Sequence, residues 1–408
     1  MLCERDAAIS VEETFKKIEV MAKLIRKIKN IIEPIYNLLK GLCIDLFYYL
    51  PIKKNKIVFI QGCGEGYRCN LKYIAEEIHR QHLPYDMVWL VKSFDIEIPK
   101  FIRKVKYNRI SAVYELATAH YMINNSKSLY LVKKKTTQKF IYIPHGQPGC
   151  KCAEGDAVLP EAWLKNSKIH SSLTDVFVSM GSYHTQVLKD TFWVPKNAEI
   201  WEVGFPRNDQ YYKDTKKKQA EIRKKLNIPE GTKIAFYAPT FRDSGTTEAY
   251  DLDLQRLLRA LASKFGSHWL LFITLHPCFA WFKHPPYHFC ENVWNMTNYT
   301  DIHELLLLAD IAISDYSSVA LDFSNTRKPV FLYASDIDEY TAMRGLKDMY
   351  YKLPFTLSKN NDELEQAILQ FDANEYSKKL EAFYKLYGSV DDGHASERFV
   401  KKLIEFEK

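Results

Sequence analysis

The chain has 408 residues and a formal net charge of +7, and 47% of its residues are hydrophobic. This length exceeds what one hydrophobic core usually holds, so a globular protein of two domains is expected. The modest positive excess suits an anionic substrate or a membrane surface, whereas a nucleic-acid partner is not expected, because no compact basic recognition motif is present.

Residues 11–50 carry the pattern of a basic amphipathic helix. Apolar residues recur at three- and four-residue steps, the period of one helical face, and lysines and arginines occupy much of the rest. Charges interrupt every window of about 20 residues, so the segment is not expected to span a bilayer. We expect it to lie on an anionic membrane surface, where each basic residue contributes about 1 kcal/mol. The alternative is a helix packed on the protein's own core with a solvated basic face.

The N-terminus and the cysteines bear on the compartment. The N-terminus lacks the basic, apolar and small-residue regions of a secretory signal peptide. None of the eight cysteines forms a Cys-x-x-Cys pair, so neither a zinc site nor a redox pair is predicted. Reduced thiols and a basic helix together predict a cytoplasmic protein that associates peripherally with the inner face of the cell membrane.

From Lys56 onward, short apolar runs alternate with helical segments. Strands are predicted at residues 56–60, 87–91, 121–124, 140–143, 176–178 and 199–203, and helices at 70–81 and 111–120. This alternation predicts parallel strands joined by right-handed crossovers. The Gly-rich turn at 61–66 lacks the spacing of a dinucleotide-binding fingerprint.

A second α/β series follows the charged, helix-prone residues 213–225. Strands are predicted at 233–237, 269–274, 311–314 and 329–333, and helices at 251–265, 303–309 and through most of the last thirty residues. The predicted organisation is therefore a helical segment over 1–50, a first Rossmann-like domain over 51–215 and a second over 216–408. The last helix is a candidate for packing back on the first domain.

Polar residues follow five of the predicted strands, in both domains. They are His145-Gly146, Pro206-Arg207-Asn208, Pro239-Thr240-Phe241-Arg242, His276-Pro277 and Ser317-Ser318. Ligands bind outside the carboxyl ends of strands in open α/β sheets, and clefts between domains are favoured sites. Imidazoles, guanidiniums and hydroxyls suit a phosphate or pyrophosphate. Taken singly, each residue has a structural alternative: a hydrogen-bonded histidine, a surface ion pair, or a serine that only caps a helix.

These motifs resemble those of the CDP-glycerol glycerophosphotransferase family, the teichoic-acid primases and polymerases and related capsule enzymes. The similarity runs across most of residues 56–404. The blocks that carry it are His145-Gly-Gln-Pro148, Gly204-Phe-Pro-Arg-Asn-Asp209, Tyr237-Ala-Pro-Thr-Phe-Arg-Asp243, Ser314-Asp-Tyr-Ser-Ser-Val-Ala-Leu-Asp-Phe323 and Asp392-Gly-His-Ala-Ser-Glu-Arg398. Five blocks in the family's order make a specific match.

The resemblance implies a GT-B-like fold, with two Rossmann-like domains facing a cleft, and transfer of a polyol phosphate from a CDP-polyol donor to a lipid-linked or glycan acceptor. Glycerol phosphate is the expected group, and His145 is the expected general base. Ser317 and Ser318 would hold the pyrophosphate, Asp322 would contact donor hydroxyls, and His276, Arg207 and Arg242 would neutralise phosphoryl charge. The donor site carried over from the family comprises His145, Gly146, Arg207, Pro239, Thr240, His276, Ser317, Ser318 and Asp322.

Two departures from the family pattern bear on specificity. Gln147 stands where the family usually has threonine, with Gly149-Cys-Lys-Cys152 after it, and no arginine precedes His276. No metal site or cofactor is expected, although assistance by Mg²⁺ stays open. Two rivals also stay open at this point: a GT-B glycosyltransferase that uses a sugar nucleotide, and a catalytically inactive, membrane-associated assembly scaffold.

Overall fold

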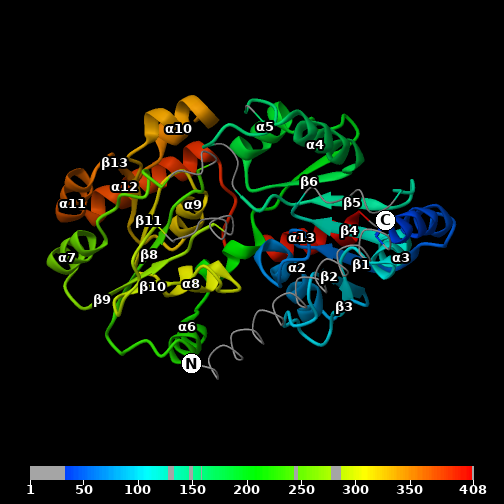
Figure 1. Ribbon diagram of the computed structural model, residues 1–408, viewed down its shortest axis with the longest axis horizontal. Coiled ribbons are helices and arrows are strands. Elements are labelled where there is room, and N and C mark those ends of the chain that lie inside the picture. The colour runs from blue at the N-terminus through cyan, green and yellow to red at the C-terminus, as the bar shows by residue number, and fades with distance from the viewer. Residues whose placement is uncertain are drawn as a thin grey trace, which may run out of the picture.

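The computed structural model describes residues 33–126, 133–146, 150–157, 159–242, 247–276 and 286–406. Two sheets, each with helices on both sides, form the two halves of the molecule (Figure 1). All neighbouring strands within each sheet run parallel. The predicted pair of Rossmann-like domains is therefore confirmed.

The first sheet has seven strands in the order β3-β2-β1-β4-β5-β6-β7. Its central strands are buried apolar runs, so they are covered on both faces, as parallel sheets require. The strands are β1 (Lys53–Ile60), β2 (Asp86–Val91), β3 (Arg103–Lys106), β4 (Ala119–Asn124), β5 (Lys139–Tyr142), β6 (Val176–Ser179) and β7 (Glu199–Glu202). The helices are α2 (Cys69–Arg80), α3 (Ile110–Thr118), α4 (Glu161–Leu173) and α5 (Ser182–Thr191), with a 3₁₀ helix η1 (Pro206–Tyr212) after β7.

The second sheet has six strands in the order β10-β9-β8-β11-β12-β13. Helix α6 (Lys216–Lys225) lies between the two sheets in the sequence, next to the predicted boundary at residue 215. The strands are β8 (Lys233–Ala238), β9 (Trp269–Ile273), β10 (Val293–Asn295), β11 (Ile311–Ser314), β12 (Val330–Tyr333) and β13 (Thr356–Ser358). The helices are α7 (Leu254–Phe265), α8 (Ile302–Leu308), α9 (Val319–Ser324), α10 (Ile337–Arg344), α11 (Asn361–Leu369) and α12 (Ala373–Tyr387), with the 3₁₀ turn η3 (Tyr350–Lys352).

The C-terminal helix α13 (Ala395–Glu405) returns to the first domain and lies beside α2 (Figure 1). The Asp209 carboxylate accepts hydrogen bonds from the first two backbone N–H groups of this helix, Ala395 and Ser396, both at 2.8 Å. On its apolar side, Phe399 packs edge-on against Trp201 of β7 at 5.7 Å. The chain therefore crosses between the two domains twice.

Residues 33–47 are helical and expose a row of apolar side chains. Among them, Leu38 and Leu46 are 67% and 66% exposed. The helix contacts the first domain through polar groups: Lys40 Nζ donates to Asn108 Oδ1 at 2.8 Å, and Lys133 pairs with Asp45. The predicted helix over 11–32 lies outside the described residues. Within the described part of the chain, no helix is both long and apolar enough to cross a membrane.

Candidate functional site at the domain junction

His145 follows β5 and presents one ring nitrogen for chemistry. Its Nδ1 lies 3.1 Å from the carbonyl oxygen of Asn125. A carbonyl only accepts, so Nδ1 carries the proton and Nε2 is left as an acceptor. His145 keeps a solvent-exposed surface, but many protein atoms lie around its ring, so the ring is partly desolvated. This burial, followed by the charges of Arg207, Lys151 and Arg68, lowers the pKa of His145, which keeps the imidazole neutral at physiological pH.

Gly146 and Ser318 face each other across the two domains. Ser318 is the residue before α9, and a methyl group placed on Gly146 would lie 3.4 Å from the Ser318 hydroxyl oxygen. Neither serine of the pair caps the helix strongly: Ser318 makes no capping bond, and Ser317 Oγ accepts from the Val319 N–H only at 3.4 Å. Both hydroxyls are half-buried. They are therefore free to meet a ligand next to His145.

Arg207 of η1 joins the domains through a buried ion pair. Its guanidinium is 1% exposed and donates to both carboxylate oxygens of Asp322 in α9, at 3.0 and 2.9 Å. The same guanidinium donates to the backbone carbonyl of His145 and to Cys69 Sγ, the latter at 3.2 Å. Despite desolvation, the Asp322 charge raises the pKa of Arg207. Arg207 and Asp322 thus balance each other's charge, and direct contact of either residue with the donor stays a prediction.

Arg242 is enclosed in the same way inside the second domain. It donates to Asp315 at 2.8 Å and to both oxygens of Asp336 at 2.6 and 2.9 Å, and it is 3% exposed. Asp315 also accepts from the N–H of Thr240 at 2.9 Å and from its hydroxyl at 2.6 Å. The loop after β8, including buried Pro239, is thus fixed to the end of β11. Two carboxylates already balance the charge of Arg242, and its neutralisation of a phosphate stays a prediction.

His276 follows β9 at the end of the described segment and is exposed. Its ring lies 5.7 Å from that of Phe241, centroid to centroid. Glu65, in the Gly-rich turn of the first domain, has a lowered pKa chiefly because Lys92 donates a hydrogen bond to it, with a smaller contribution from the charge of His276. His276 therefore lies on the side of the second domain that faces the first.

Sequence reasoning missed Lys151. This residue lies in an isolated antiparallel β-bridge that joins the two domains. Lys151 bridges to Leu346, and Cys152 N–H donates to Gly345 O at 3.1 Å. Burial lowers the pKa of Lys151, whereas the nearby Asp315 raises it. Within the described residues, the Lys151 ammonium forms no ion pair. Asp315, Asp336 and Asn125 were not named as site residues either, although Asp315 lies inside the family block at 314–323.

The predicted site residues thus meet where the two domains join, which we call the domain junction (residues 145–151, 206–207, 239–242, 276 and 315–322 where described). It combines a neutral imidazole base, two serine hydroxyls and one unneutralised ammonium, held by two enclosed arginines. This set can deprotonate a hydroxyl and stabilise phosphoryl oxygens. Among the described side chains, no group of three or more His, Cys, Asp or Glu is arranged to hold a metal ion.

Known proteins resemble the chain over most of its length. A polymerase named teichoic acid poly(glycerol phosphate) polymerase from Staphylococcus epidermidis is 29% identical over 95% of this chain, and a teichoic acid glycerol-phosphate transferase from Staphylococcus aureus is 29% identical over 93%. The match covers 56% of the first relative and 99% of the second. The chain spans about half the length of the first relatives it matches, 54% for the Bacillus subtilis polymerase.

A solved structure of the wall teichoic acid polymerase TagF, in a variant soaked with CDPG, matches with a TM-score of 0.80 and 29% identity. The alignment covers 95% of this chain and 97% of that one, so the GT-B-like arrangement of the two domains is confirmed. The family model described as CDP-glycerol:poly(glycerophosphate) glycerophosphotransferase matches residues 42–405. The chain therefore belongs to the CDP-glycerol:poly(glycerophosphate) glycerophosphotransferase family.

Proposed function

We propose that the chain transfers a polyol phosphate, with glycerol phosphate as the expected group, from a CDP-polyol donor to a hydroxyl of a lipid-linked or glycan acceptor. CMP is the leaving group, and the product belongs to a teichoic-acid-like or capsule polymer. The observation that carries this proposal is the Nδ1–H bond from His145 to Asn125, which leaves Nε2 unprotonated next to Gly146, the residue that faces Ser318. Family membership supplies the class of donor.

In the proposed reaction, Nε2 of His145 accepts the proton of the acceptor hydroxyl while its oxygen attacks the phosphorus that carries the polyol. The bond between that phosphorus and the CMP oxygen breaks, and the electron pair leaves with CMP. Phosphoryl transfer depends mainly on positioning and electrostatics, so no covalent enzyme intermediate is required. The lowered pKa of His145 supports this role, because the base must be neutral before it acts.

The remaining site residues divide into two groups. Ser317, Ser318, Thr240, His276 and Lys151 are proposed to contact donor phosphates, and Gly146 gives the donor room to approach. Arg207, Asp322 and Arg242 are proposed as positioning residues, since their charges are balanced within the protein. The first domain, with His145, is assigned the acceptor, and the second, with the loops after β8 and β11, the nucleotide.

The exposed apolar face of residues 33–47 is proposed to bind the membrane surface, on the cytoplasmic side. Isolated exposed leucines are ordinary, but a helical row of them together with basic residues suits the boundary between headgroups and acyl chains. This arrangement would hold the first domain close to a lipid-linked acceptor.

A donor panel tests the proposed activity. Purified protein is incubated with CDP-glycerol, CDP-ribitol, UDP-sugars or GDP-sugars and a lipid-linked glycerol phosphate acceptor, and products are identified by mass. Release of CMP together with an acceptor heavier by one polyol phosphate is expected. Release of UDP or GDP instead would favour a glycosyltransferase, and the absence of any turnover would favour the inactive scaffold.

A further inference from the structure

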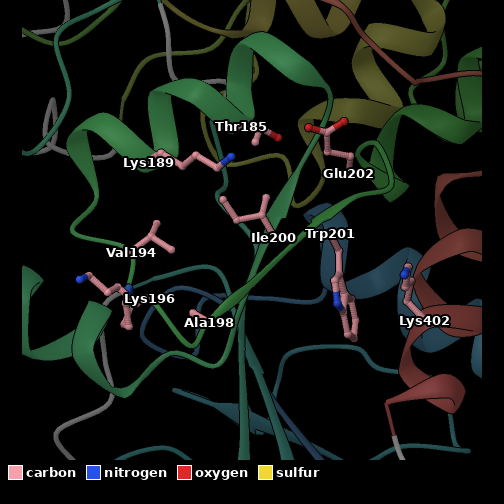
Figure 2. Close-up of a pocket in the computed structure, with 10 residues that line it drawn as sticks. Thr185, Lys189, Val194, Lys196, Ala198, Ile200, Trp201, Glu202 and Lys402 are labelled. Carbon is pink, nitrogen blue, oxygen red and sulfur yellow. The ribbon is translucent and has the colours of Figure 1, made fainter.

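A surface pocket lies along β7, the edge strand of the first sheet, away from the domain junction. Helix α5 borders it on one side and α13 on the other (Figure 2). Its volume of about 680 Å³ falls in the range of sites that hold small ligands or segments of longer ones. None of the residues assigned above to the proposed reaction lines it.

Three lysines from separate elements border this pocket. Lys189 comes from α5, Lys196 from the loop before β7 and Lys402 from α13 (Figure 2). Within the described residues, none of the three forms an ion pair or a side-chain hydrogen bond. Glu202 is the one acidic residue among those that line the pocket. The pocket therefore carries an excess of positive charge that the described protein does not balance.

The rest of the lining is mostly apolar, and this narrows the class of ligand. Val194, Ala198 and Ile200 lie between the lysines (Figure 2). Trp201 lines the pocket too but is only 2% exposed, so its ring offers no face on which a nucleobase could stack. Spaced ammonium groups over an aliphatic floor suit a chain that alternates phosphates with short carbon units.

The position of the pocket relates it to the proposed reaction. β7 is two strands from β5, the strand that His145 follows. The axes of β5 and β7 are therefore about 10 Å apart across the sheet. Four residues separate Glu202 from Arg207, so five Cα-to-Cα steps place their Cα atoms at most about 18 Å apart. A polymer whose end reacts at His145 can therefore reach the pocket with units close to that end.

We propose that this pocket binds a phosphodiester segment of the acceptor polymer, behind the terminal hydroxyl that reacts. The inference rests on the proposed function, since it assumes that the acceptor grows into a polyol-phosphate chain. Lys189, Lys196 and Lys402 each contact a phosphate, and the apolar floor contacts the carbon units. The pocket thereby favours long acceptors over short ones.

Binding is measured first, without any donor, so that this test does not depend on catalysis. Soluble oligo(glycerol phosphate) is titrated into wild-type protein and into a variant with Lys189→Glu, Lys196→Glu and Lys402→Glu. A matched control carries Lys217→Glu, Lys378→Glu and Lys385→Glu, which change the same charge on exposed helix surfaces of the second half of the chain. We expect affinity to fall at least tenfold in the pocket variant alone.

The salt dependence gives a second readout. Each phosphate contact contributes about 0.7 to the slope of log affinity against log salt for a flexible single-stranded polyanion, so loss of three contacts should lower the slope by about 2. An equal loss of affinity in the control variant would show general charge attraction and overturn the assignment. A change in sedimentation of the pocket variant with unchanged affinity would identify an interface between copies and overturn it as well.

Turnover then separates this inference from the proposed function. With CDP-glycerol, the pocket variant should keep wild-type kcat/KM on an acceptor of one unit and lose about tenfold on a long oligomer. If the pocket variant keeps wild-type kcat/KM on the long oligomer as well, the inference is overturned while the proposed activity stays intact. If wild-type protein turns over no CDP-polyol, the proposed activity fails, and the binding titration still decides whether the pocket holds a phosphodiester.

Discussion

The ion pair between Arg207 and Asp322 offers a sharp test, because each side chain comes from a different domain. Asp322→Asn removes the negative charge and keeps the shape of the side chain. The guanidinium of Arg207, which is 1% exposed, then has no carboxylate partner. Removing one partner of a buried pair costs about 3–5 kcal/mol, whereas replacing both by apolar residues of similar size is often neutral. Asp322→Asn should therefore lower the free energy of unfolding by about that amount, and the combination Arg207→Met with Asp322→Leu should restore most of it.

The double variant separates stability from function. Urea unfolding followed by circular dichroism measures the free energy, and CMP release measures turnover. We expect the double variant to fold stably but to turn over slowly, because nothing then holds the backbone carbonyl of His145. A cost below about 1 kcal/mol for Asp322→Asn, or normal turnover in the double variant, would refute the view that this pair positions the base.

Three further predictions concern the base, the junction lysine and the exposed helix. His145→Ala should lower turnover by about 10²-fold or more without abolishing donor binding, and near-normal turnover of this variant would contradict its role. The pKa of His145 is lowered from its ordinary value of 6.5, so the midpoint of the acid fall in wild-type kcat/KM should lie below pH 6.5, and a midpoint above that value would contradict the assignment. Lys151→Met should raise the KM for CDP-glycerol about tenfold or more. Lys217→Met, at an exposed lysine, is the matched control, and an unchanged KM in Lys151→Met would remove Lys151 from the donor site. Leu38→Glu with Leu46→Glu should abolish cosedimentation with vesicles that contain anionic lipid and leave turnover of a soluble acceptor unchanged. Undiminished cosedimentation of this variant would show that the helix face does not bind the membrane.

The buried strands were the most predictable part of the fold. The apolar run at 311–314 was predicted with the bounds that β11 has in the structure, and the strands at the centres of both sheets were found within a few residues. The strands that were missed are short or polar edge strands. β3 reads Arg-Lys-Val-Lys, and β10 and β13 have three residues each, so their pairing comes from the neighbouring strand and not from their own sequence.

Sequence reasoning grouped the candidate site residues but did not predict which of them contact one another. Residues at strand ends could be grouped because parallel strands end at the same edge of a sheet. The charge balance could not be predicted, since Arg207 lies 115 residues from Asp322, and Arg242 lies 94 residues from Asp336. Both arginines are thus enclosed by carboxylates. Lys151, which carried no motif signal, forms no ion pair within the described residues.

The contacts of Arg207 also bear on the fate of a donor that arrives before its acceptor. The guanidinium holds the backbone of His145 on one side and a carboxylate of the opposite domain on the other. Any parting of the domains breaks the carboxylate contacts and releases the support of the base. In the proposed reaction, a water molecule that enters through such an opening would meet a misaligned imidazole, which predicts slow hydrolysis of a bound donor while the two halves are apart.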